Sequence, residues 1–312
     1  MSDENNNEAD TCEVNTSCCA SCGVAEVDDI KLVPCDSCDL VRYCSDECRE
    51  LHRSEHAEEC NKKRAAELRD ELLFKQTKST HLGDCPICMI PLPLDKSKSW
   101  LMSCCSKIIC NGCFYADTKR TARGRRQYTC PFCREPFIMT DEERGKLVMK
   151  RIEANDPVAL YEEGGKHLHK GDYESAFEYW TKAAEVGDVE AHYGLSILYQ
   201  HGKGVDKDEG KEIHHLEEAV IGSHPVARYN LGCIEWNNGD KKKALMHYII
   251  AAAQGENKST KALMDFFKLG VFEKDVLDVA LRAHKAAINA TKSPQRKVAD
   301  KLEGRVVIVR KK

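Results

Sequence analysis

The chain has 312 residues, enough for two or three domains, and a formal net charge of -4 at pH 7. A net negative charge argues against a general affinity for nucleic acid. No stretch reaches the apolar length of a membrane span, and the first ten residues, MSDENNNEAD, lack the apolar core of a secretory signal.

Cysteine usage divides the chain into two halves. Of its 18 cysteines, 17 lie between Cys12 and Cys133, and only Cys233 follows. A secreted disulfide scaffold is the alternative to metal binding, but such chains are usually short and follow a signal peptide. We therefore expect a reducing compartment, the cytoplasm or the nucleus, in which paired Cys-x2-Cys units are metal ligands.

Cysteine spacing, helical patterns and an internal repeat predict a multidomain protein with seven regions. The expected fold class is two small zinc modules with little regular structure and short helices, followed by an all-α solenoid of helix pairs. The regions are a disordered tail (1–17), a first cysteine cluster (18–60), a helical linker (61–84), a second cysteine cluster (85–134), a linker helix (135–155), helical repeats (156–290) and a basic C-terminal tail (291–312).

Both linkers have helical signals. Leu68 and Leu72 belong to one modest apolar face of the first linker. In the second, Thr140 precedes three acidic residues, which is a good helix start.

The first cluster offers seven thiolates and one imidazole as candidate zinc ligands. Structural zinc takes four soft ligands in a tetrahedron, so eight ligands indicate two ions. Cys44-x3-Cys48 and His56-x3-Cys60 are i, i+4 pairs, which suit helices that present both ligands on one face. The full set is Cys19, Cys22, Cys35, Cys38, Cys44, Cys48, His56 and Cys60.

The run from Tyr43 to Cys48, followed by His56-x3-Cys60, resembles the MYND zinc finger, and the resemblance covers residues 19–60. It implies a cross-braced module that recruits short, often proline-containing, peptides. His52 stands where the family often has Trp, and we interpret it as a surface helix residue. The resemblance assigns Cys19, Cys22, Cys44 and Cys48 to one ion and Cys35, Cys38, His56 and Cys60 to the other.

The second cluster offers eight thiolates, which again suit two ions. Its first and last pairs, Cys85-Pro-Ile-Cys88 and Cys130-Pro-Phe-Cys133, resemble a RING finger over residues 85–134. The resemblance assigns Cys85, Cys88, Cys110 and Cys113 to one ion and Cys104, Cys105, Cys130 and Cys133 to the other.

The middle of this cluster departs from the usual RING pattern. The position of the usual histidine ligand falls on Lys107, a cation that cannot bind zinc at neutral pH. We expect Cys104 and Cys105 to replace it. Because successive side chains diverge in extended backbone, the loop must turn sharply for both thiolates to reach one ion.

Three further residues match the partner-binding surface of RING-type ubiquitin ligases. Ile87 and Pro131 stand where that family contacts a ubiquitin-conjugating enzyme, and Arg134 stands where a cation bridges that enzyme and ubiquitin. The alternative is that Ile87 and Pro131 only shape the metal loops and that Arg134 is merely exposed. A nearby basic run from Lys119 to Arg126 is interpreted as a solvated loop in preference to a nucleic-acid site.

The segment after residue 155 repeats itself. Residues 171–187 and 239–255 share Gly-Asp at the start, paired alanines and a final Gly, and Trp180 is matched by Tyr248. The pattern resembles Sel-one-like repeats, relatives of the tetratricopeptide repeat, with three good units over 156–255 and a degenerate fourth to about 290. The resemblance implies a surface that binds protein partners. The paired histidines His214 and His215 are expected on the helix surface.

Two functions are consistent with these modules. The first is a zinc-binding ubiquitin ligase of the RING type, with about four zinc ions, in which the first finger and the repeats recruit substrate or partners. The second is a non-enzymatic, zinc-dependent adaptor. No catalytic side chains are expected in either case, because a RING positions reactants that other proteins carry.

Overall fold

The computed structural model describes residues 18–27, 30–38, 40–77, 79–123, 128–136 and 140–302. The predicted disordered tail with Cys12, and the final residues 303–312, lie outside this range. The chain divides into two compact units, Met1–Leu73 and Phe74–Lys312. Each is described by itself.

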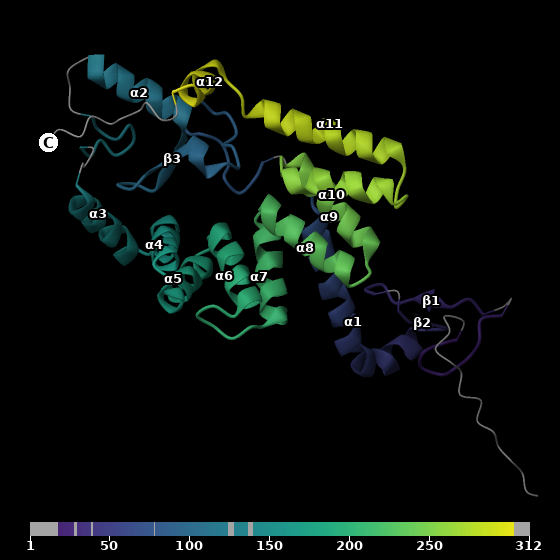
Figure 1. Cartoon of the computed structure of the whole chain (residues 1–312). Helices are drawn as coiled ribbons and strands as arrows, with labels where there is room; N and C mark the ends of the chain where they lie inside the picture. Colours follow the sequence, from purple (N-terminus) through teal and green to yellow (C-terminus); the bar gives the residue numbers. More distant parts are fainter. Residues whose placement is uncertain are drawn as a thin grey trace, which may run out of the picture. The chain divides into compact units, whose positions relative to one another are not determined.

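The first unit combines a two-stranded antiparallel sheet with one long helix (Figure 1). Strands β1 (Val33–Pro34) and β2 (Arg42–Tyr43) pair with Val33 opposite Tyr43. Helix α1 (Asp46–Phe74) begins with two acidic residues, which favour a helix N-terminus. The first linker therefore continues the finger's own helix, and that helix ends ten residues before the predicted boundary at 84. The predicted apolar face is confirmed only in part: Leu73 is 6% exposed, whereas Leu68 and Leu72 are 53% and 48% exposed.

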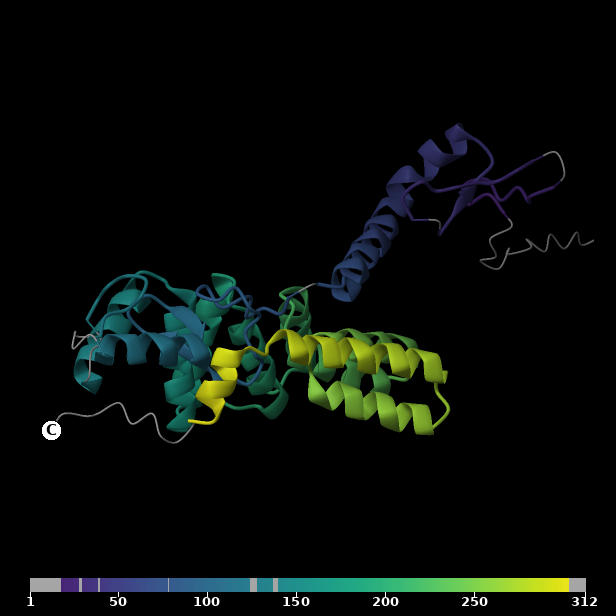
Figure 2. The same cartoon turned by 90° about the horizontal axis from the view of Figure 1, so that it is seen from above.

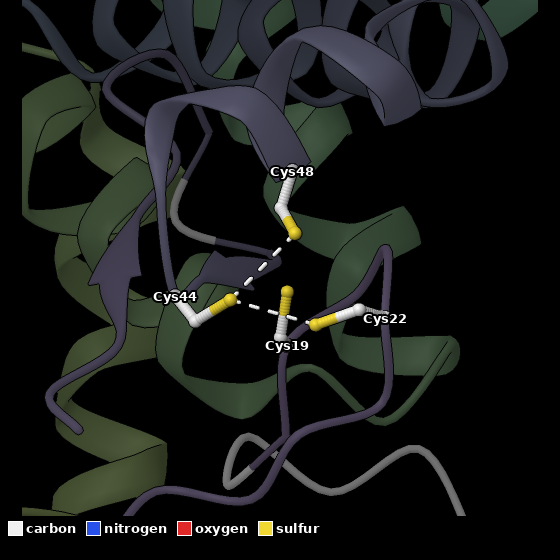
Figure 3. A group of neighbouring side chains, drawn as sticks. All are labelled: Cys19, Cys22, Cys44 and Cys48. Carbon is white, nitrogen blue, oxygen red and sulfur yellow. Dashed lines mark hydrogen bonds between the residues drawn. The ribbon is translucent and has the colours of Figure 1, made fainter.

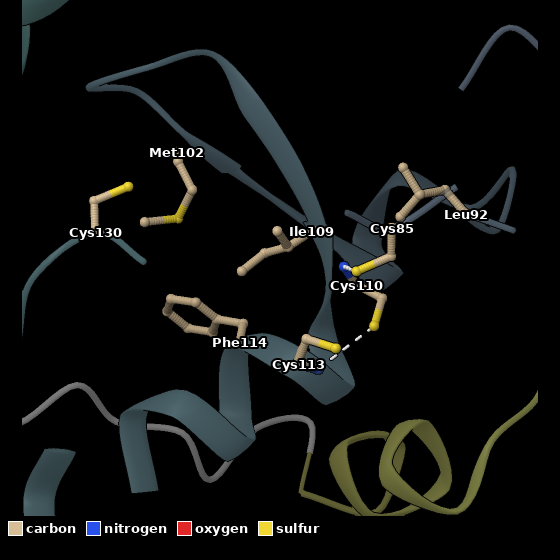
Figure 4. Packing of buried hydrophobic residues seen from close by; sticks show 8 residues of the cluster. All are labelled: Cys85, Leu92, Met102, Ile109, Cys110, Cys113, Phe114 and Cys130. Atoms are coloured by element: carbon tan, nitrogen blue, oxygen red, sulfur yellow. Dashed lines mark hydrogen bonds between the residues drawn. The ribbon is translucent and has the colours of Figure 1, made fainter. Parts of the chain in front are cut away.

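The second unit begins with the second cysteine cluster. It contains a short 3-10 helix (Lys96–Lys98), the antiparallel pair β3 (Ser99–Met102) and β4 (Lys107–Cys110), and helix α2 (Asn111–Arg123). Its core joins Leu92, Met102, Ile109 and Phe114 to four of the cysteines (Figure 4). The basic run is not wholly a loop: Lys119 and Arg120 lie on α2, and Arg125 and Arg126 lie outside the described residues.

The rest of the unit is an array of helices that pack in sequential pairs (Figure 2). Helix α3 begins after the predicted cap Thr140, whose side chain accepts a hydrogen bond from the backbone N–H of Glu143. The helices are α3 (Asp141–Glu153), α4 (Pro157–His169), α5 (Tyr173–Glu185), α6 (Val189–His201), α7 (Glu209–Ile221), α8 (Pro225–Asn237), α9 (Lys241–Ala253), α10 (Asn257–Lys268), α11 (Lys274–Ala290) and α12 (Pro294–Asp300). Helices α10 and α11 form the predicted fourth pair.

The repeated residues have clear physical roles. Asp172 and Asp240 cap α5 and α9 by accepting backbone N–H hydrogen bonds, and the preceding Gly171 and Gly239 have φ of 81° and 89°. Trp180 fills the space above Gly164, where an added Cβ would lie 2.5 Å from the indole. The equivalent contact two repeats further along the chain joins Tyr248 to Gly232, at 2.9 Å. Small residues thus let the helices approach closely.

Two expectations for this unit were wrong. The segment after residue 290 is not simply a tail, because Pro294–Asp300 forms α12, which packs against α2 (Figures 1 and 2). His215 is partly buried, with its ring 5.6 Å from that of Tyr199, and burial is the main cause that lowers its pKa to about 4; His214 is exposed as predicted. Among the described residues, no helix combines the length and apolarity that a membrane crossing requires.

Candidate metal centres

The structure brings the cysteines and His56 together in the four predicted sets. Within each set, the ligand atoms all lie within 4.8 Å of one another. The members are Cys19, Cys22, Cys44 and Cys48 (site 1), Cys35, Cys38, His56 and Cys60 (site 2), Cys85, Cys88, Cys110 and Cys113 (site 3), and Cys104, Cys105, Cys130 and Cys133 (site 4).

Site 1 joins three separate segments of the first unit (Figure 3). The sulfur of Cys44 lies 3.4 Å from that of Cys22 and 3.6 Å from that of Cys48. Cys44 follows β2 and precedes α1, so only Cys48 of this i, i+4 pair is helical. The sharp entry into α1 brings both sulfurs to the same point.

Site 2 takes two ligands from successive turns of α1, as predicted. The Cys38 sulfur lies 3.1 Å from His56 Nε2, and the sulfurs of Cys35 and Cys60 lie 3.9 Å apart. His52 lies on α1 outside the ligand sets, as expected, but it is partly buried and not a plain surface residue. Its Nδ1 lies 3.1 Å from the hydroxyl of buried Tyr43, and its ring stacks on that of His56 at 5.7 Å. His52 therefore supports a ligand without being one.

Sites 3 and 4 share the second module. At site 3 the sulfurs of Cys88 and Cys110 are 3.8 Å apart. At site 4 the Cys105 sulfur lies 3.7 Å from that of Cys130, and the Cys104 sulfur 3.4 Å from that of Cys133.

The sharp turn that site 4 requires is present. The backbone N–H groups of Cys105 and Ser106 both donate to the Met102 carbonyl, at 3.0 and 2.8 Å, and Ser106 has φ of 56°. This turn directs two successive cysteines to one point. Lys107 begins β4 with an exposed side chain and takes no part in the site.

Three of the metal loops share a backbone device that spacing alone did not reveal. The N–H groups of Gly23, Met89 and Arg134 donate to the carbonyls of Cys19, Cys85 and Cys130, respectively, at 2.8, 2.8 and 3.1 Å. All three donors have positive φ, of 73°, 53° and 62°. The left-handed residue after each Cys-x2-Cys pair closes a knuckle that turns both sulfurs to one side. The backbone of Arg134 therefore has a structural role whatever its side chain does.

The donor sets fit zinc. A tetrahedron with zinc–sulfur bonds of about 2.3 Å has sulfur–sulfur edges of about 3.8 Å, close to the observed separations. The thiols also need a cation. A hydrogen bond from Cys110 is the main cause that lowers the pKa of Cys85 to about 4, and the same contact is the main cause that raises the pKa of Cys110. Four neighbouring thiols cannot all ionise without a compensating positive charge.

The metal count tests site 4. We expect the full chain to bind four zinc ions and Cys105→Ser to bind three, because a hydroxyl is a poor replacement for a thiolate ligand. Cys233→Ser, which changes a cysteine far from both clusters, should retain four. Elemental analysis of zinc per chain measures the difference, and an unchanged count in Cys105→Ser would contradict the assignment.

A fifth polar cluster, which the sequence did not suggest, surrounds Glu190 on α6. His81 Nε2 lies 2.9 Å from Glu190 Oε1, while Lys96 Nζ and His224 Nε2 lie 2.9 and 3.6 Å from Oε2. The Glu190 side chain is 15% exposed, and those of His81 and His224 are 6% and 4% exposed. Burial by itself would raise the pKa of Glu190, but hydrogen bonds from His224 and His81 and the charge of Lys96 hold it well below its usual range.

The histidine tautomer argues against a metal in the Glu190 cluster. His224 Nδ1 accepts a hydrogen bond from the N–H of Ala227, as the cap of α8, so that nitrogen carries no proton. Nε2 must then carry the proton, which makes it a donor to Glu190 and not a metal ligand. The ammonium group of Lys96, 2.9 Å from Oε2, also supplies the positive charge that a metal ion would bring. This cluster is a polar anchor between the second module and the helices.

Comparison with known families matches two of the three predicted modules. The MYND finger model matches residues 19–60, and the Sel1 repeat model matches residues 158–188, 189–220 and 225–256. The chain carries a MYND finger and Sel1 repeats. A MYND finger binds zinc, so zinc is a cofactor of this protein. Neither match covers the second cysteine cluster.

Relatives share only parts of the chain. DAP3-binding cell death enhancer 1 of Rattus norvegicus is 28% identical over 79 residues, which is 25% of this chain and 16% of that protein. Its Mus musculus counterpart is 38% identical over 50 residues, 16% of this chain and 10% of that protein. Chitin synthase regulatory factor 2 of Schizosaccharomyces pombe is 23% identical over 167 residues, 51% of this chain and 33% of that protein. The chain thus spans at most a third of these relatives.

Two solved structures are similar to the helical part. A Sel1 repeat protein from Oxalobacter formigenes has 32% identity and a TM-score of 0.35, covering 38% of this chain and 95% of that chain. The antigen c5321 of uropathogenic Escherichia coli, with an SLR fold, has 20% identity and a TM-score of 0.37, covering 52% of this chain and 36% of that chain.

Proposed function

We propose that this protein is a zinc-dependent adaptor that joins other proteins through its MYND finger and its Sel1 repeats. The observation that carries the proposal is the composition of the metal sites. Each of the four cysteine-rich sites has four protein ligands, which leaves no position for an activated water or a substrate. Metal sites of this kind are structural, and the modules that they stabilise are interaction modules. We place the adaptor in the cytoplasm or the nucleus, where its thiols stay reduced.

The finger's partner is a short peptide, with proline-containing peptides as the first choice. His52 is held by Tyr43 and His56, so a smaller and more polar ring stands where the family often has Trp. We expect binding to an array of proline-containing peptides to require zinc. Chelation removes the ions that hold the cysteine and histidine ligands together, so the finger should lose the folded surface that binds the peptide. Binding that survives chelation, or no zinc-dependent binding to any peptide, would contradict this role.

The second candidate function is a RING-type ubiquitin ligase, and one observation favours it. Ile87, Pro131 and Arg134 all lie on the exposed sides of the knuckles at sites 3 and 4, with Ile87 43% exposed. A large aliphatic side chain held open to solvent is suited to a partner protein such as a ubiquitin-conjugating enzyme. This candidate requires that the second module act as a RING.

Ubiquitin-chain formation with a panel of conjugating enzymes separates the two candidates. A ligase should lose about tenfold or more of its activity in Ile87→Ala and in Arg134→Ala, since each removes a contact of 1–2 kcal/mol. Two variants are the matched controls. Met149→Ala changes an exposed apolar residue on α3, and Lys119→Ala changes an exposed cation on α2 of the second module. If the activity is unchanged in Ile87→Ala and Arg134→Ala, these residues do not form the surface that binds the conjugating enzyme. If the wild type forms no ubiquitin chains with any conjugating enzyme, the result supports the adaptor.

A further inference from the structure

Helix α12 returns to the second module and inserts one arginine beside site 3. Arg296 is 7% exposed although it is a cation. Its guanidinium donates to the carbonyls of Pro91, at 2.6 Å, and Ile90, at 3.0 Å. It also donates to the carbonyl of Thr291 at 2.7 Å and approaches the Cys88 sulfur to 3.5 Å. The guanidinium therefore grips the knuckle that carries two ligands of site 3.

The backbone of α12 lies unusually close to the same site. Gly112 stands between the ligands Cys110 and Cys113, and a Cβ added there would lie 2.8 Å from the backbone nitrogen of Arg296. Such an approach leaves no room for a side chain at position 112. Two segments separated by more than half of the chain thus meet at site 3 without an intervening layer.

Charge explains why an arginine stands there. Four thiolates around a doubly charged zinc ion leave two uncompensated negative charges. Cys85, Cys110 and Cys113 are 0%, 1% and 4% exposed, so water solvates this site poorly. Site 4 contains the exposed Cys133 and site 1 the exposed Cys22, which water can reach. Burying a net charge is costly unless a paired opposite charge offsets it.

We propose that Arg296 is an outer-sphere partner of the zinc ion at site 3, and that α12 acts as a clasp that positions the 85–91 knuckle. The inference rests on the proposed zinc binding of the second module. The Arg296 guanidinium donates to the Cys88 thiolate and to the carbonyls of Ile90 and Pro91. These contacts partly offset the negative charge on the sulfur and hold the 85–91 knuckle in place. Outer-sphere partners of this kind typically change metal affinity 10–100-fold. Ile87 lies in the same loop, so the clasp also fixes the surface offered to a partner.

The full chain loaded with ¹¹³Cd provides the test. Each bound ion gives its own NMR signal, and loss of one signal in Cys113→Ser identifies site 3. We expect Arg296→Met to shift the site 3 signal and to release that one ion about 10–100-fold faster to a chelator, with the other three ions unchanged. Arg296→Lys keeps the charge without the planar fork and should lie between Arg296→Met and wild type.

Two further variants separate the clasp from general loosening. Lys297→Met removes the exposed neighbouring cation on α12 and should behave as wild type. Gly112→Ala forces α12 away without changing a charge and should also release the site 3 ion faster. An unchanged signal and release rate in Arg296→Met would overturn the proposal, as would equal acceleration of two or more ions. A wild-type chain that binds no ion in the second module would instead refute the proposed zinc binding itself.

Discussion

Removal of zinc from the full chain is expected to unfold residues 18–136 while most of the helices from α4 to α11 persist. Structural zinc contributes about 10–16 kcal/mol per site in small modules, which exceeds the stability of most whole domains. The helices instead depend on apolar contacts such as those of Leu195, Leu216 and Leu263, all at most 1% exposed. Far-UV circular dichroism and limited proteolysis, before and after a strong chelator, measure the two parts separately.

The surviving helices should nevertheless melt at a lower temperature after chelation. The second module contacts these helices through the Glu190 cluster and through Arg296. Both sets of contacts are lost when the module unfolds. Restoring zinc should restore the melting temperature. Loss of all helical signal on chelation, or no change in proteolysis, would contradict this organisation.

Glu190→Gln is expected to destabilise the second unit by about 3 kcal/mol. The substitution removes the buried negative charge that pairs with Lys96 and accepts from His81, and breaking one partner of such a group costs about 3–5 kcal/mol. An amide also offers N–H groups to those donors, so at least one donor is left without an acceptor. For a unit of this size, the shift in melting temperature is about 2–4 °C for each kcal/mol.

The pH dependence of this loss has a defined sign. Because the folded-state pKa of Glu190 is depressed, its contribution is complete above the unfolded value of about 4.3 and is lost as pH falls through the folded pKa. The difference in unfolding free energy between wild type and Glu190→Gln should therefore include the full carboxylate contribution at pH 7 and shrink below about pH 5. Chemical denaturation of both proteins at each pH measures it.

Glu185→Gln is the matched control, since Glu185 is exposed near the end of α5. It should change the stability by less than about 0.5 kcal/mol at every pH. Equal effects of the two substitutions would show that Glu190 is an ordinary surface carboxylate.

Local spacing explains which features the sequence could predict. The pairs at Cys85 and Cys130 form within single turns, so their grouping follows from a few residues of chain. The repeat boundaries follow from glycine and aspartate at positions such as Gly171 and Asp172, where backbone conformation and capping are local properties. The chemistry of site 4 requires a sharp turn after Cys105, and the turn at Ser106 provides it.

The features that the sequence could not predict depend on contacts between distant segments. Glu190 is one of many acidic residues, and only the fold places His81 and His224 beside it. Helix α12 is seven residues long, too short for a reliable periodic pattern, and Arg296 is one of many cations near that part of the chain. The partial burial of His52 depends in part on Tyr43, which lies on another element.

The position of Arg296 in the chain has a consequence for biosynthesis. Once Cys133 has been translated, every cysteine of the second module is present in the nascent chain. Arg296, whose guanidinium contacts site 3, is translated much later. At roughly 5–20 residues per second, the wait is on the order of 10–30 s. Under the proposed role of Arg296, the nascent module lacks this cation throughout that interval, so we expect site 3 to reach its final affinity only after α12 has been translated.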